Sequence, residues 1–234
     1  RPSLGSAANG FGRYQRSVDS SIPYALLDDS VSIFTPDNFG IIKESNTAVF
    51  FGVANKIEAQ YPSGLTASWE FDISSASSGF LQIAIDLGAM GAFETDDVFS
   101  LTASIDGGEP FSLLSLIANP SSNQTYTMES GTSQSLTGPM TVDGIETLNN
   151  NLQTITRTIT ATGNSLTINL TALLDDETSS TDEAIAMQSI RICEAPSAQD
   201  AGLLAECVVE NNNDSGSGNG DITFIHDVQG SGEI

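Results

Sequence analysis

Short runs in which apolar and polar residues alternate constrain the fold of this chain most strongly. In "LTASWEFDI" (65–73) every second residue is apolar, and "GFLQIAIDLGA" (79–89) repeats the pattern. Successive side chains of a strand point to opposite faces, so such runs between Gly, Asn, Asp and Ser clusters predict half-buried strands. Further short apolar runs, not all in strict alternation, occupy residues 48–54, 97–106, 111–117, 153–162, 165–174 and 184–193. The pattern predicts an all-β antiparallel sandwich or barrel over residues 22–210.

The segments on either side of this core have a different composition. Residues 1–21 are small, polar and glycine-containing, without a sustained period, and predict an N-terminal arm. Residues 211–221 are rich in Gly, Ser and Asn and predict a linker. The apolar alternation that follows predicts that residues 222–234 contain the first strand of a following domain.

The charge of the chain is strongly negative and unevenly distributed. Thirty Asp and Glu face seven Lys and Arg, for a net charge of −23, whereas residues 1–16 contain three arginines and no acid. A negative surface repels phosphates and anionic lipids and attracts cations, so we expect no direct nucleic-acid binding. General solubility or adaptation to a salty medium explains the charge equally well. No stretch approaches the roughly 20 apolar residues of a membrane span, so none is predicted.

The chain contains two cysteines, Cys193 and Cys207. Zinc sites use more closely spaced pairs and further ligands, which one histidine cannot supply. We therefore predict a disulfide, which would stabilise the fold by roughly 3 kcal/mol in the chain-entropy model. Disulfides indicate an oxidising compartment, so we expect a secreted or cell-surface protein. Two separate buried thiols are the alternative.

The residues needed for most catalytic motifs are absent. The one histidine, His226, lies beyond the predicted linker, so the core lacks a Ser-His-Asp triad. No phosphate-binding loop, nucleotide fingerprint or His-Glu metalloprotease motif occurs. Carboxylate pairs of the glycosidase type are numerically possible, but thirty acids produce such pairs by chance. We therefore predict that this chain is not itself an enzyme.

Two acidic clusters are the candidate metal ligands. Glu94, Asp96 and Asp97 lie in "FETDDVF", at a predicted turn, and Asp182 and Glu183 lie in the loop before the last core strand. Calcium takes six to eight oxygen ligands, and loops between strands supply both carboxylates and backbone carbonyls. If the two clusters meet at one edge of the sandwich, they form a calcium site. Alternatively, these acids only solvate turns.

Four motifs carry a resemblance to a known family. They are "ASWEFDI", "FETDDVFSLTASIDGGEPFSLLSL", "LTINLTALLDDETSSTDEAIAMQSIRI" and "ITFIHDVQGSGE". In this order they resemble the N-terminal jelly-roll module of large secreted bacterial proteins of the extracellular nuclease type. In that family an OB-like domain and then an endonuclease/exonuclease/phosphatase domain follow. The resemblance therefore implies a jelly-roll β-sandwich that ends at the start of an OB-like domain.

The resemblance also bears on the acidic residues. It matches Glu94 and Asp97 to an early Glu/Asp pair, and Asp182 and Glu183 to a later Asp-Glu pair, which implies calcium ligation or the fixing of an edge. Where the family often has Asp-Asn, this chain has Gln188 and Ser189, so one carboxylate is missing. The phosphoesterase domain lies outside the chain, so no catalytic residue can be assigned by resemblance.

The combined prediction is a non-catalytic, calcium-stabilised accessory, adhesion or carbohydrate-binding module of a larger secreted protein. Trp69 could stack on a sugar, but its alternation with Leu65 and Phe71 favours the core. One alternative is a fragment of a secreted nuclease without its catalytic domain. Another is a filament subunit, in which the basic arm binds the acidic body of the next copy.

Overall fold

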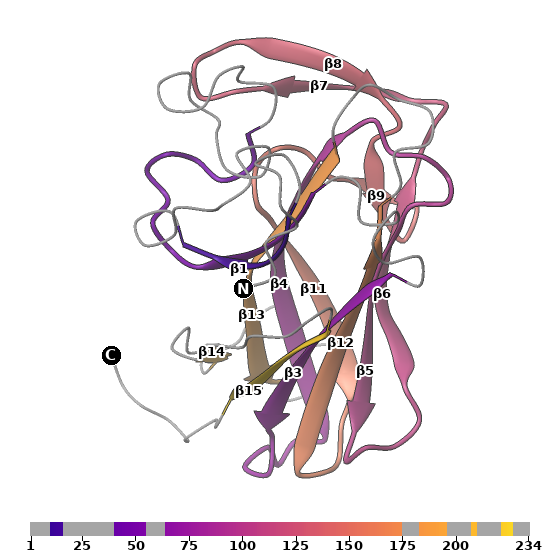
Figure 1. The fold of residues 1–234 in the computed structure, drawn as a ribbon. Coiled ribbons are helices and arrows are strands. Elements are labelled where there is room, and N and C mark those ends of the chain that lie inside the picture. The colour runs from indigo at the N-terminus through magenta and orange to yellow at the C-terminus, as the bar shows by residue number, and fades with distance from the viewer. Residues whose placement is uncertain are drawn as a thin grey trace.

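Two β-sheets packed face to face form the body of the molecule (Figure 1). The computed structural model describes residues 10–15, 40–54, 64–174, 183–195, 207–209 and 221–226. These residues form strands and turns, and the predicted all-β sandwich is confirmed. Within the same ranges no helix is long and apolar enough to cross a membrane.

The first sheet has six strands in the order β1-β2-β13-β4-β11, with β14 beside β13. Their bounds are β1 Gly10–Tyr14, β2 Phe50–Ala54, β4 Phe80–Gly91, β11 Gln153–Thr160, β13 Glu183–Glu194 and β14 Cys207–Val209. The second sheet has seven strands in the order β10-β9-β6-β5-β12-β3-β15. Their bounds are β3 Leu65–Asp72, β5 Val98–Ile105, β6 Phe111–Ala118, β9 Met140–Val142, β10 Glu146–Thr147, β12 Ser165–Leu173 and β15 Asp221–His226. Strands β7 (Asn123–Thr127) and β8 (Ser133–Thr137) pair as a separate hairpin, at the top of Figure 1.

The order of the strands identifies the sandwich as a jelly roll. The chain alternates between the sheets from β2 to β5, and it does so again from β11 to β13. This places β2-β13-β4-β11 in one layer and β3-β12-β5-β6 in the other, the eight-stranded double Greek key of the jelly roll. Among the described strands every pairing is antiparallel except that of β15 with β3.

The core is built from the inward-facing positions of the alternating runs. In β3, Leu65, Ala67, Trp69 and Phe71 are buried, whereas the intervening residues face outward. Trp69 is 2% exposed, and its ring meets that of Phe51 edge-on, with 5.6 Å between centroids. The prediction that Trp69 is a core residue is confirmed, and its ring is not accessible for stacking on a sugar.

Strands also lie in both segments predicted to flank the sandwich. Within the predicted arm, β1 pairs with β2, and Phe11 is fully buried with its ring 4.9 Å from that of Phe51. At the other end, β15 lies parallel to β3, although its residues were predicted to open a following domain. An edge strand offers open backbone groups, so either segment can pair there, whether or not its own sequence pattern predicts a strand. The other residues of both segments lie outside the described ranges, and the following domain stays a prediction.

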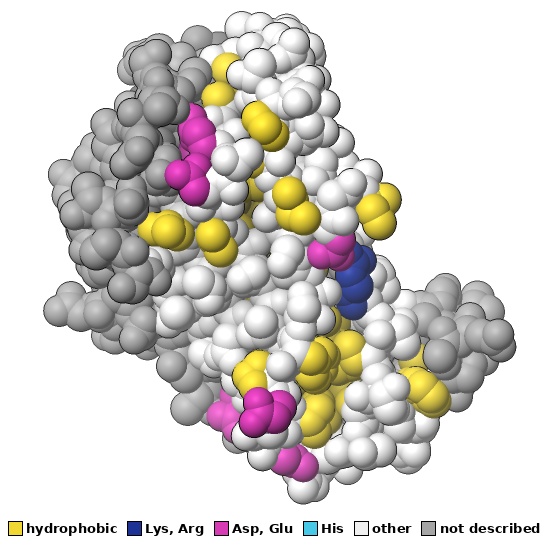
Figure 2. Space-filling model, turned by 90° about the vertical axis from the view of Figure 1, so that its right-hand side faces the viewer, with side chains coloured by type: hydrophobic (Ala, Val, Ile, Leu, Met, Phe, Trp, Pro, Cys, Tyr) yellow, Lys and Arg dark blue, Asp and Glu magenta, His cyan; other side chains and the backbone are white. Residues whose placement is uncertain are grey.

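Charged side chains do not gather in one patch on the face that Figure 2 shows. The acidic side chains on this face lie apart from one another. Arg157 of β11 and Asp143, in the turn between β9 and β10, form an ion pair between the two sheets. The exposed large hydrophobic side chains of the described ranges are Val98, Ile117 and Ile145.

A polar network joins the three strands β4, β13 and β11. Both guanidinium NH2 groups of Arg191 donate to Asp86, over 2.6 and 2.8 Å, and the hydroxyls of Ser189 and Thr154 donate to the same carboxylate. Burial by itself would raise the pKa of Asp86. The hydrogen bonds from Arg191, Ser189 and Thr154, with the charge of Arg191, outweigh burial and lower this pKa from 3.8 to about 2. The ionised carboxylate therefore stabilises the folded chain.

We expect Asp86→Asn to destabilise the fold in a pH-dependent manner. The folded-state pKa lies below the unfolded value of about 3.9, so the stabilisation is complete above that value and is lost as the pH falls toward 2. With allowance for solvent screening, the variant should lose about 1–2 kcal/mol at pH 7 and clearly less near pH 2.5. Urea unfolding at both pH values measures this, with exposed Glu70→Gln as control. An equal loss at both values would contradict the assignment.

Candidate metal site

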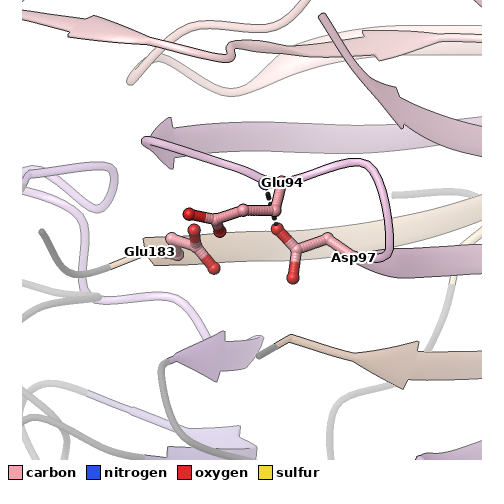
Figure 3. A group of neighbouring side chains, drawn as sticks. All are labelled: Glu94, Asp97 and Glu183. Atoms are coloured by element: carbon pink, nitrogen blue, oxygen red, sulfur yellow. Dashed lines mark hydrogen bonds between the residues drawn. The ribbon is translucent and has the colours of Figure 1, made fainter. Parts of the chain in front are cut away.

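Three carboxylates converge at one end of the sandwich (Figure 3). Glu94 and Asp97 lie in the turn between β4 and β5, and Glu183 is the first residue of β13. One carboxylate oxygen of each residue lies within 4.8 Å of the corresponding oxygens of the other two. The β4–β5 turn passes from the first sheet to the second, so the group lies where the two layers are connected.

Glycine and local hydrogen bonds position these side chains. Glu183 pairs with Gly91 across the sheet, and a Cβ atom at Gly91 would lie 2.8 Å from the Glu183 Cα. Glycine thus allows the two strands to approach at this point. In the turn, the backbone N–H of Glu94 donates to Asp97 Oδ2 over 2.7 Å. This bond, drawn dashed in Figure 3, holds the Asp97 carboxylate beneath the turn.

The three carboxylates lie close together, and two of them have almost no access to water. Asp97 is 5% exposed and Glu183 1% exposed. Two ionised carboxylates within 4.8 Å of one another would repel by about 3.5 kcal/mol or more at an effective dielectric constant of 20. A cation between the three oxygens would convert this repulsion into attraction. The group could therefore hold a metal ion.

The atoms of the group restrict which metal would fit. All three ligands are carboxylate oxygens, which suit hard cations such as calcium, magnesium or manganese. Zinc and copper sites usually include imidazole or thiolate. This chain has one histidine and two cysteines, and Cys193 is disulfide-bonded. The donor set thus agrees with the oxygen-liganded site that the sequence predicted.

The five predicted ligands do not all lie in the same place in the structure. It brings Glu94, Asp97 and Glu183 together, although they come from two distant acidic clusters. Asp96 is exposed and is not part of the group. Asp182 lies outside the described residues. The residues that support the group, such as Gly91 opposite Glu183, carry no signal that sequence reasoning could have recognised.

Gln188 and Ser189, which stand where the resemblance expects Asp-Asn, have partners of their own. Gln188 and Asn46 exchange two amide hydrogen bonds of 3.0 Å, and Ser189 donates to Asp86. Neither residue belongs to the carboxylate group. Both side chains therefore take part in polar contacts away from the carboxylate group.

The two cysteines lie on neighbouring strands. Cys193 of β13 is disulfide-bonded, and the register of β13 with β14 places Cys207 directly opposite it. Since the chain has two cysteines, Cys207 is the partner that the chain itself offers. The bond would tie the short strand β14 to the first sheet.

Comparison with protein-family models and with curated proteins found no match for this chain. The resemblance to secreted modules of the nuclease type therefore stays a prediction from the motifs.

A second glycine, Gly138, supports the turn that carries Glu94, and its replacement should be costly. Gly138 has φ +74°, its carbonyl accepts a 3.1 Å bond from the N–H of Phe93, and a Cβ here would lie 2.3 Å from the Phe93 oxygen. Gly131 has φ +85° but nothing within 4 Å of an added Cβ. Gly131→Ala should cost about 1–2 kcal/mol through backbone strain alone. Gly138→Ala should cost a further 1–3 kcal/mol, roughly, through overpacking.

Urea unfolding of the two variants beside the wild type measures this difference. The matched control is Gly131→Ala, because both substitutions impose the same kind of backbone strain. Equal destabilisation by the two would mean that the turn accommodates a Cβ atom at Gly138 without cost, against the close approach of Phe93.

Proposed function

We propose that this chain is a non-catalytic module of a secreted protein, and that a calcium ion bound by Glu94, Asp97 and Glu183 stabilises it. The observation that supports the proposal most is the convergence of these three carboxylates from two distant segments. A bound cation would join the β4–β5 turn to the start of β13. The ion would thus stabilise the connection between the two sheets.

The burial of the group favours a structural role over a catalytic one. A catalytic metal keeps an open position for water or substrate, whereas Asp97 and Glu183 are almost inaccessible to solvent. The jelly roll itself hosts many functions and does not indicate an activity. The nuclease-fragment and filament hypotheses stay predictions.

Calcium fits the proposed setting better than magnesium does. Magnesium demands near-ideal octahedral geometry and gives up its water reluctantly, whereas calcium accepts irregular sets of six to eight oxygens. Three carboxylates leave several positions for backbone carbonyls or water. Extracellular modules bind calcium with dissociation constants of about 10⁻⁴–10⁻³ M, which suits a secreted protein. The disulfide-bonded Cys193 supports such an oxidising environment.

Calcium should raise the melting temperature of the wild-type chain. At a hundred times its dissociation constant a ligand adds about 2.7 kcal/mol to the free energy of unfolding, roughly 5–10 °C for a domain of this size. Glu183→Gln should abolish this gain, because it removes one of the three negatively charged ligands. Asp96→Asn, which removes the same charge from the same turn as Glu94, should retain it. Thermal melts in EDTA and in excess calcium measure all three proteins.

Two outcomes would contradict the proposal. If the wild-type chain melts at the same temperature in EDTA and in excess calcium, no stabilising site exists. If Asp96→Asn loses the gain as completely as Glu183→Gln does, the effect comes from general surface charge.

A further inference from the structure

A small polar pocket lies where the segment before β2 meets the segment before β11. Its volume is about 250 Å³. The residues that line it are Ile41, Lys43, Ser45, Asn46, Asn151 and Leu152. It shares no residue with the carboxylate group.

The walls of the pocket are held by specific contacts. Both segments cross β4 at Gly88, where an added Cβ would lie 2.7 Å from Ile41 Cγ2 and 3.4 Å from the Asn151 carbonyl oxygen. The N–H of Asn46 donates to the carbonyl of Lys43 over 2.8 Å. The side chain of Asn46 is fixed by its two hydrogen bonds with Gln188. The pocket is thus pre-formed, which lowers the entropy cost of binding a ligand.

Its hydrogen-bonding groups are available to a ligand. Lys43, Ser45 and Asn151 are exposed, and among the described contacts none engages the ammonium, the hydroxyl or the side-chain amide of these three residues. No acid lines the pocket, although the chain has a net charge of −23. The lining therefore offers one positive charge and neutral hydrogen-bonding groups, together with the half-buried apolar side chain of Leu152.

We infer that this pocket binds a single carboxylated sugar residue, of the uronic-acid type. The Lys43 ammonium would pair with the carboxylate, and the Ser45 hydroxyl and Asn151 amide would bond to sugar hydroxyls. The C–H face of the ring would lie on the half-buried Leu152, because Ile41 is 2% exposed and offers almost no surface. The volume is below the roughly 300–1,000 Å³ of pockets for drug-sized ligands, so one sugar residue fits better than an oligosaccharide. The inference goes beyond the proposed function, because it gives the module a ligand class and requires no cation.

Calorimetric titration with three small probes tests the inference. Methyl β-D-glucuronide carries the ring and the carboxylate, methyl β-D-glucoside the ring alone, and acetate the carboxylate alone. We expect the glucuronide to bind at least ten times more tightly than either of the others. Titration in EDTA and again in calcium separates this result from the metal proposal, because pocket binding should be the same in both.

Substitution of Lys43 identifies the site of binding. Lys43→Met keeps the aliphatic stem but removes the charge, and should weaken glucuronide binding at least tenfold while leaving glucoside binding unchanged. Arg157→Met removes the same charge elsewhere on the surface and should leave both unchanged. A melting curve for each variant checks that it folds. Absence of glucuronide binding at millimolar concentration, or equal affinity of the Lys43→Met variant, would overturn the inference.

Discussion

The pairing of β4 with β13 is the interaction on which the rest of the structure depends. These two twelve-residue strands lie side by side within the first sheet, and their register runs from Glu183 opposite Gly91 to Glu194 opposite Leu81. A slip of one residue would turn every side chain of a strand to the other face. The same register brings Glu183 to the carboxylate group and Arg191 to Asp86.

A bulge in the pairing of β13 with β4 contains two residues that make polar contacts. The register of β13 against β4 shifts between Met187 and Ile190, so Gln188 and Ser189 form a bulge. Gln188 holds Asn46 at the wall of the pocket, and Ser189 joins the network around Asp86. Strand β13 thus contributes to the carboxylate group, to the pocket wall and to the network around Asp86.

Eight strands of the jelly roll could be predicted to within two residues, because each is a short apolar run between clusters of turn residues. The hairpin β7–β8 could not, because each of its strands buries one hydrophobic side chain, Tyr126 or Leu136. The sequence left two interpretations of the acidic clusters open, that they meet at one edge or that they only solvate turns. The choice of Asp97 rather than its neighbour Asp96 could not be predicted, because it depends on the conformation of the turn.

The sequence by itself determined the all-β class, the negative charge and a set of ligands restricted to oxygen, because alternation and composition are local properties of the chain. Only the tertiary structure decided that Glu183 meets Glu94 and Asp97, and that Phe11 belongs to the first sheet. It also decided that Lys43 and its neighbours form a pocket with residues before β11. These contacts join segments far apart in the chain. The packing and register of strands select them, and no local pattern encodes that selection.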